Sequence, residues 1–148
     1  MEVIRMAYSV DVEKARKFAL HAHTGRVDKA GMPYAGHLER VAGRLMDDPA
    51  TAVVAWLHDT VEDTGVTLDL IRSEFGEETA AAVEAITHRP GEDYMEYVKR
   101  AGEHPFARKV KISDLIDNSN LSRLPNVTMK DVNRQKKYNV ALSYLMSL

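Results

Sequence analysis

Apolar residues recur every three or four positions along most of this chain, and strict alternation of apolar and polar residues is nowhere sustained. The first such stretch places five apolar side chains at helical spacing: Val12, Ala15, Phe18, Ala19 and Ala22. A period near 3.6 indicates amphipathic helices with one buried face, whereas strands would show a period of two. The pattern therefore predicts an all-α fold.

Caps and breakers divide this pattern into about eight helices with short connections. After the first helix, the segment 24–33 loses the periodicity and holds two glycines and a proline, which is typical of an irregular loop. Further helices are expected over residues 37–45, 51–63, 67–76, 77–88, 93–101, 105–124 and 128–148. No connection is long enough to separate domains, so residues 1–148 are expected to form one compact helical bundle.

Composition narrows the possible chemistry. The 148 residues hold 20 Lys and Arg against 22 Asp and Glu, and a net charge of -2 favours neither nucleic acid nor an anionic membrane as a partner. The chain has no cysteine, which leaves histidine and carboxylate as the available metal ligands. With no signal-peptide core and no apolar run long enough to span a bilayer, a cytoplasmic protein is expected.

The stretch from Ala55 to Thr64 places one imidazole and three carboxylates within two turns of an otherwise apolar helix. Burying this much charge is costly unless something compensates it, and a divalent cation does so directly. Adjacent His58 and Asp59 diverge by about a quarter turn on a helix, so both can reach one ion. The stretch therefore predicts half of a metal site.

Two further residues complete the expected ligand set. His37 lies among apolar residues that should face the core, and Asp114 lies close to the buried side of the helix expected over 105–124. Three helices meeting at one ion would then supply His37, His58, Asp59 and Asp114. Two nitrogen and two oxygen ligands with open positions suit Mn²⁺, Fe²⁺ or another octahedral ion better than a closed structural zinc.

The order of these residues resembles the HD-domain metallohydrolases, which carry a histidine, a His-Asp pair and a distant aspartate on helices. The His-Asp-Thr-Val-Glu-Asp-Thr sequence of residues 58–64 is more narrowly similar to the hydrolase domain of the RelA/SpoT alarmone enzymes and their small stand-alone relatives. Other similar segments follow in the same order: His23-Thr24-Gly25, Lys29, Gly31, Pro33-Tyr34, Phe75-Gly76, residues 83–87, residues 111–114 and Asn118.

This resemblance implies hydrolysis of the 3′-pyrophosphate of (p)ppGpp, with Mn²⁺ at the four ligands and a small-molecule nucleotide as the partner. It implies that Glu62 and Asp63 position or deprotonate the attacking water. Neighbouring carboxylates also raise each other's pKa, which suits a base near neutral pH. Lys29, Lys111 and Asn118 are expected to hold the substrate, and Arg26 is equally well explained as a solvated surface charge.

Two departures from the family pattern leave the substrate open. Asp28 stands where the family has a cation, and Asn120 stands where it commonly has an arginine. The alternatives are an HD phosphohydrolase acting on another nucleotide, such as a nucleoside monophosphate, and a nucleotide sensor without catalysis. Apolar residues of the last helix pack either on the core or on a second subunit, so a homo-oligomer also stays open.

Overall fold

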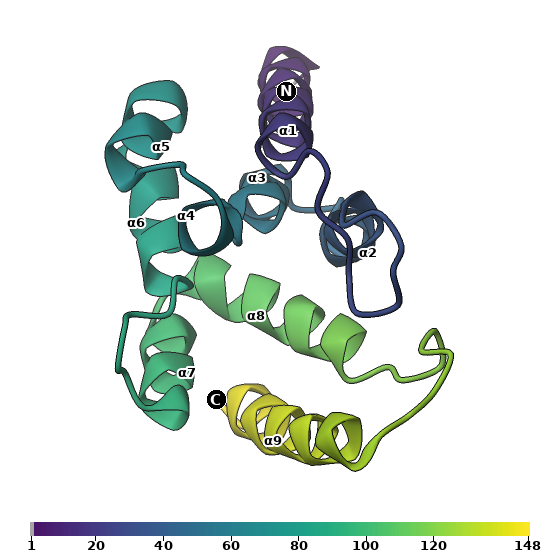
Figure 1. Cartoon of the computed structure of the whole chain (residues 1–148). Coiled ribbons are helices and arrows are strands. Elements are labelled where there is room, and N and C mark those ends of the chain that lie inside the picture. The colour runs from purple at the N-terminus through teal and green to yellow at the C-terminus, as the bar shows by residue number, and fades with distance from the viewer. Residues whose placement is uncertain (1) are drawn as a thin grey trace.

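Helices are the regular elements throughout the part of the chain that the structure describes. The computed structural model describes the backbone of residues 2–148 and the side chains from residue 11 onward. Within this range the prediction of an all-α fold is confirmed, and nine helices follow one another along the chain (Figure 1). They are α1 (Glu2–Ala22), α2 (Ala35–Gly43), α3 (Pro49–Leu57), α4 (Thr60–Asp63), α5 (Leu68–Phe75), α6 (Glu77–Ala85), α7 (Tyr94–Glu103), α8 (Pro105–Asn118) and α9 (Met129–Met146).

Local capping chemistry sets several of the helix ends. The Thr67 side chain accepts the backbone N–H of Leu70 at the start of α5, and Gly76 ends that helix with a φ of 94°. Thr128 and Asp131 form a full capping box at the start of α9, which agrees with the helix expected from residue 128. These ends could be predicted because the capping residues act within a few positions of the backbone groups that they satisfy.

Helix α3 lies at the centre and packs against α1, α2, α6 and α8 (Figure 1). Its residues 51–57 are all buried, which agrees with an apolar stretch that lacks a polar face. The prediction of one continuous helix over 51–63 is wrong in one respect, because α3 ends at Leu57 and α4 begins at Thr60. The Thr60 hydroxyl donates to the Leu57 carbonyl at 2.8 Å, which competes with the helical backbone bonding at this break.

Two groups of buried apolar side chains hold the helices together. The larger group surrounds α3 and includes residues of α1, α2, α5 and α6. The smaller group joins α7, α8 and α9 through Tyr97, Val98, Leu115, Ala141 and Leu145. Helix α8 contributes to both groups and crosses the middle of the molecule (Figure 1). Side chains at the centre of α8 therefore lie between the two apolar groups.

Helix α9 packs on the same molecule through Ala141 and Leu145, while Val140 and Met146 on its other side are exposed. The apolar residues near the C-terminus thus contribute to the smaller core. Among the described residues, none of the helices has the length and apolar content that crossing a bilayer requires.

Candidate functional site

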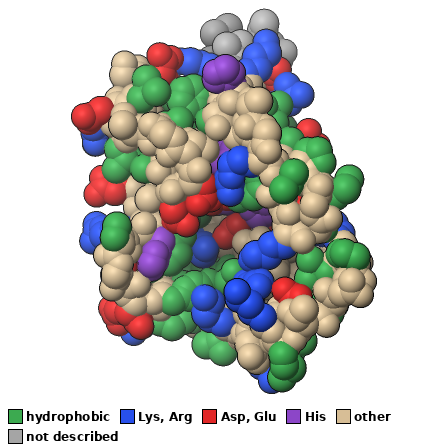
Figure 2. Space-filling model, viewed as in Figure 1, with side chains coloured by type: hydrophobic (Ala, Val, Ile, Leu, Met, Phe, Trp, Pro, Cys, Tyr) green, Lys and Arg blue, Asp and Glu red, His purple; other side chains and the backbone are tan. Residues whose placement is uncertain are grey.

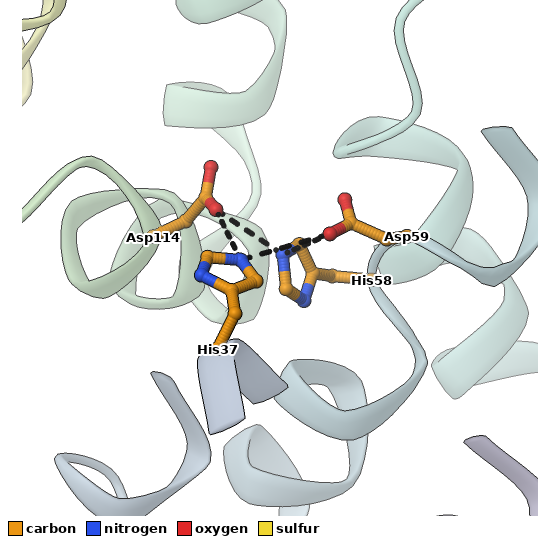
Figure 3. A group of neighbouring side chains, drawn as sticks. All are labelled: His37, His58, Asp59 and Asp114. Carbon is orange, nitrogen blue, oxygen red and sulfur yellow. Dashed lines mark hydrogen bonds and ion pairs between the residues drawn. The ribbon is translucent and has the colours of Figure 1, made fainter. Parts of the chain in front are cut away.

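Three helical segments bring together the four residues that the sequence singled out as metal ligands. His37 comes from α2, His58 and Asp59 lie at the break between α3 and α4, and Asp114 comes from the middle of α8 (Figure 3). One ligand atom from each residue lies within 4.8 Å of the other three. The Nε2 atom of His37 lies 3.1 Å from Asp114 Oδ1, and that of His58 lies 3.1 Å from Asp59 Oδ2.

Both histidines direct Nε2 toward the centre of this cluster because Nδ1 is engaged on the other side of the ring. His58 Nδ1 donates to the Ala55 carbonyl at 2.6 Å, and His37 Nδ1 donates to Asp117 Oδ2 at 2.7 Å. A proton on Nδ1 leaves the Nε2 lone pair available for a metal. The two imidazoles therefore present Nε2 to the cluster, one held by the backbone and one by a carboxylate.

Each carboxylate of the cluster is also held by neighbours. The Tyr34 hydroxyl donates to Asp59 Oδ2. Lys111 Nζ lies 2.9 Å from Asp114 Oδ2, and the Asn118 amide donates to Asp114 Oδ1 at 3.0 Å. These contacts fix the side-chain rotamers of both aspartates, so the four ligand atoms are positioned by the folded protein.

The protonation equilibria of the cluster reflect mutual charge compensation. Burial lowers the pKa of His58, but the negative charges of Asp59 and Asp114 outweigh it and raise this pKa well above the ordinary value. Burial raises the pKa of Asp114, but Lys111 and the two histidines hold it well below the usual range. Protons on both imidazoles would balance the two carboxylates, and a divalent cation supplies the same charge. The donor set therefore fits a divalent metal.

Glu62 and Asp63 lie on α4 and line the same cavity as Asp59 and Asp114. Glu62 Oε1 accepts the backbone N–H of His88 at 2.8 Å, which ties α4 to the loop after α6. Burial, followed by the charges of Asp59 and Glu62, raises the pKa of Asp63 to about 6. The pKa of Asp63 therefore lies near neutrality mainly because of burial, and the neighbouring carboxylates add to the effect.

The loop between α1 and α2 forms a small hairpin at the cavity edge. Val27 and Pro33 form an isolated antiparallel bridge, and Gly31 has a φ of 81°, which favours glycine. Asp28 Oδ1 accepts the backbone N–H groups of Ala30 and Met32 at 2.9 and 3.0 Å. The carboxylate at position 28 therefore stabilises the turn.

Arg26 belongs to the site and is not simply a solvated charge. Its guanidinium carbon lies 4.2 Å from the centre of the Tyr34 ring, and its Nη1 atom lies 3.6 Å from Asp63 Oδ2. The same Nη1 atom lies 2.8 Å from His23 Nδ1, which must then act as the acceptor. Arg26 thus links the loop before α2 to the acid pair on α4.

The cluster opens into a cavity of about 560 Å³ with walls of opposite charge. Figure 2 shows the hollow, with acidic side chains gathered at its upper edge and Lys and Arg below it. The acids include Asp59, Glu62 and Asp63, and the cations across the cavity include Lys29, Arg134 and Lys137. Such a cavity can bind an anion between a metal and a basic wall.

The predicted substrate-binding residues differ in how the structure engages them. Lys29 lines the cavity, and burial followed by the charge of Arg134 lowers its pKa. Lys111 and Asn118 also line the cavity, but both contact Asp114 directly. In the structure, these two contacts orient the carboxylate of Asp114.

Several cavity residues were not predicted from the sequence: Tyr34, Arg40, Asp117, Arg123, Arg134 and Lys137. Asp117 carried a usable signal, because it lies three residues after Asp114 on the same helix and so shares its face. Arg134 and Lys137 carried no comparable signal, since only the packing of α9 beside α8 brings them to the site.

Comparison with known proteins identifies relatives of this chain. A family model described as the HD domain matches residues 15–114. A protein of Aquifex aeolicus (strain VF5), named guanosine-3′,5′-bis(diphosphate) 3′-pyrophosphohydrolase, is 33% identical over 122 residues, which cover 75% of this chain and 18% of that protein. A probable GTP pyrophosphokinase of Mycobacterium leprae (strain TN) is 32% identical over 124 residues, covering 76% of this chain and 16% of that protein. The chain thus spans less than a fifth of the length of these curated relatives.

A solved structure of a metazoan orthologue of SpoT, described as hydrolysing ppGpp and acting in starvation responses, has the same fold. It matches with a TM-score of 0.78 and 20% identity, covering 91% of this chain and 84% of that chain. The resemblance to the RelA/SpoT hydrolase domain and its relatives is thereby confirmed. With the family match extending over more than half of its residues, the chain belongs to the HD domain family.

Proposed function

We propose that this chain is a metal-dependent nucleotide phosphohydrolase that removes the 3′-pyrophosphate of guanosine 3′,5′-bis(diphosphate). The observation that carries the proposal is the cavity itself, where a two-histidine, two-aspartate cluster faces a basic wall with an acid pair beside it. The name of the Aquifex aeolicus relative supports the choice of substrate. Hydrolysis of ppGpp would consume one water and release GDP and pyrophosphate.

The proposed metal is Mn²⁺ or another octahedral divalent ion, held by His37, His58, Asp59 and Asp114. When bound there, such an ion would lower the pKa of a water molecule and polarise a phosphoryl oxygen. The protein's part is to present two neutral imidazoles through Nε2 and two carboxylates with fixed rotamers. The contacts of Ala55, Asp117, Tyr34 and Lys111 described above provide that orientation.

Glu62 and Asp63 are the proposed proton acceptors for the attacking water. Both face the cavity, and the pKa of Asp63 near 6 leaves it able to accept a proton at neutral pH. The hydrogen bond from the His88 backbone holds Glu62 in place, and Arg26 holds Asp63 from the other side. The pair is therefore anchored at two points, as positioning a small nucleophile requires.

The basic wall provides the proposed site for the phosphates that are not cleaved. Lys29 comes from the hairpin before α2, whereas Arg134 and Lys137 come from α9. Arg134 pairs with Asp131 at 3.3 Å, and Lys137 lies 4.3 Å from the centre of the Tyr94 ring. A nucleotide with phosphates on both its 3′ and 5′ sides could then reach the metal and this wall together. Lys111 and Asn118 complete the proposed substrate contacts near the metal.

A second candidate retains the metal chemistry but acts on another nucleotide. Asp28 favours it, because this carboxylate lines the cavity beside Lys29 and reduces the positive charge there. A nucleotide panel separates the candidates. With Mn²⁺ present, ppGpp should be converted to GDP and pyrophosphate faster than GTP, GDP and nucleoside monophosphates are hydrolysed. Preferred release of phosphate from a monophosphate would favour the second candidate, and nucleotide binding without turnover would indicate a sensor.

Replacing Asp114 tests the metal site. Asp114→Ala should reduce bound metal at least tenfold, because it removes one of four ligands. It should also lower the free energy of unfolding by about 3–5 kcal/mol, since buried Lys111 and the histidines lose their partner. Elemental analysis and chemical denaturation measure the two effects. Asp69→Ala, which changes a carboxylate 95% exposed, is the control. Unchanged metal content in Asp114→Ala would exclude this residue as a ligand.

Replacing the acid pair separates catalysis from metal binding. The double variant Glu62→Gln with Asp63→Asn should keep its metal but lose at least 100-fold in kcat, because general base catalysis contributes about 10²–10⁴-fold. Single-turnover kinetics with ppGpp and parallel metal analysis make the measurement. The adjacent acids of α6 offer a matched control, Glu77→Gln with Glu78→Gln. Turnover equal to that of the wild type in the first variant would show that the base lies elsewhere.

Lys137 tests the basic wall. Lys137→Met should raise KM about tenfold with kcat little changed, because a charged contact to a phosphate that does not react stabilises ground state and transition state alike. Steady-state kinetics with ppGpp give both constants. Lys136→Met changes the neighbouring exposed lysine, which does not line the cavity, and should leave KM unchanged. Equal KM values in the two variants would remove Lys137 from the substrate site.

A further inference from the structure

Asp117 lies directly behind one of the proposed ligands. It is on α8, one turn beyond Asp114, and only 1% of its surface is exposed. Its Oδ2 atom lies 2.7 Å from His37 Nδ1, on the side of the ring opposite the ligand cluster. One face of α8 therefore carries both the proposed ligand Asp114 and the carboxylate of Asp117, which contacts the proposed ligand His37.

Three arginines hold the Asp117 carboxylate in place. Arg40, three residues after His37 on α2, approaches both oxygens, with Nε 2.7 Å from Oδ1 and Nη2 3.3 Å from Oδ2. Arg44 lies 3.6 Å from Oδ1, and Arg123 lies 3.4 Å from Oδ2. A bidentate arginine contact restricts the plane of a carboxylate as well as its position. The oxygen facing His37 therefore has a fixed location.

The two histidines of the cluster are oriented by different means. His58 Nδ1 donates to a backbone carbonyl of its own helix, so no side chain can be changed to alter that contact. The contact of His37 crosses from α2 to α8 and depends on one side chain. A carboxylate also makes the imidazole a stronger ligand than a neutral acceptor does.

We propose that Asp117 is the positioning residue of His37, which fixes the imidazole as the Nδ1–H tautomer with Nε2 facing the metal. Arg40, Arg44 and Arg123 keep the carboxylate in the orientation that this requires. The inference rests on the proposed metal site, but not on the identity of the nucleotide. Its consequence is that metal affinity depends on a residue that does not touch the metal.

The decisive variant is Asp117→Asn, which keeps the shape but replaces one oxygen with an N–H donor. The arginines need an acceptor, so the amide oxygen turns toward Arg40 and the NH₂ group faces His37. His37 must then accept at Nδ1 and carry its proton on Nε2, the wrong tautomer for the metal. We expect a 10- to 100-fold loss of Mn²⁺ affinity in a chelator competition assay.

A second measurement reports the tautomer directly. Long-range ¹H–¹⁵N NMR of the metal-free protein, at a pH where the ring is neutral, should show Nδ1–H for His37 in the wild type. Asp117→Asn should show Nε2–H for His37, whereas His58 should stay Nδ1–H in both proteins. A purely structural role for Asp117 would not produce this selective change.

Glu92→Gln is the matched control, because Glu92 is also a carboxylate held by an arginine, at 2.8 Å from Arg100, and it lies away from the cluster. It should lower the melting temperature without changing metal affinity. Should Asp117→Asn fail to fold, Arg40→Gln loosens the carboxylate without removing it, and we expect a smaller loss of affinity.

Three outcomes would overturn the inference: an Nε2–H tautomer of His37 in the wild type, Mn²⁺ affinity in Asp117→Asn within twofold of the wild type, or an equal loss in Glu92→Gln. A wild-type protein that binds Mn²⁺ but does not hydrolyse ppGpp would contradict the proposed function alone.

Discussion

The compensation of charge among His37, His58, Asp59 and Asp114 is the constraint on which the rest of the structure depends. Three of these side chains are buried and the fourth is nearly so, which would be prohibitively costly for isolated charges. They are tolerated because each imidazole faces a carboxylate, at 3.1 Å in the closest pairs, so that either protons on the imidazoles or a bound cation can balance the acids. This requires α2, the break after α3, and α8 to meet at one point. The large apolar core around α3 holds them there.

The same constraint explains why the cavity has two different walls. The acids proposed to hold the metal and to accept a proton lie on and around α3, α4 and α8, and the cations proposed to contact phosphates lie on the hairpin before α2 and on α9. Acids and bases also pair within the site. Arg26 with Asp63 and Lys111 with Asp114 hold particular carboxylates in place, and Arg134 on the basic wall pairs with Asp131. An acidic edge facing a basic wall is the arrangement that the proposed binding of a metal and a phosphate in one pocket requires.

The sequence predicted the cluster well because its signals were local. His58 and Asp59 are adjacent in the sequence, so they stay close whether or not the helix continues. The break between α3 and α4, which was not predicted, therefore left the predicted proximity of the two residues intact. His37 and Asp114 stood out as polar residues on apolar faces. The partners of the site were harder to predict, since the proximity of Asp117 to His37 and of Lys137 to Tyr94 arises from contacts between distant helices. Lys111 and Asn118 line the cavity, but their contacts with Asp114 depend on side-chain rotamers that no pattern specifies.

The hairpin before α2 shows how a departure from the family pattern can be accommodated. An acid at position 28 would repel a phosphate if it pointed freely into the cavity. Its Oδ1 atom instead accepts two backbone N–H groups of the turn, and hydrogen bonds to a carboxylate offset part of its negative charge. This turn also sets the position of the next residue, Lys29, on the cavity wall. The acid thus helps to present the neighbouring cation, and any effect on substrate choice acts through the shape of the loop as well as through its charge.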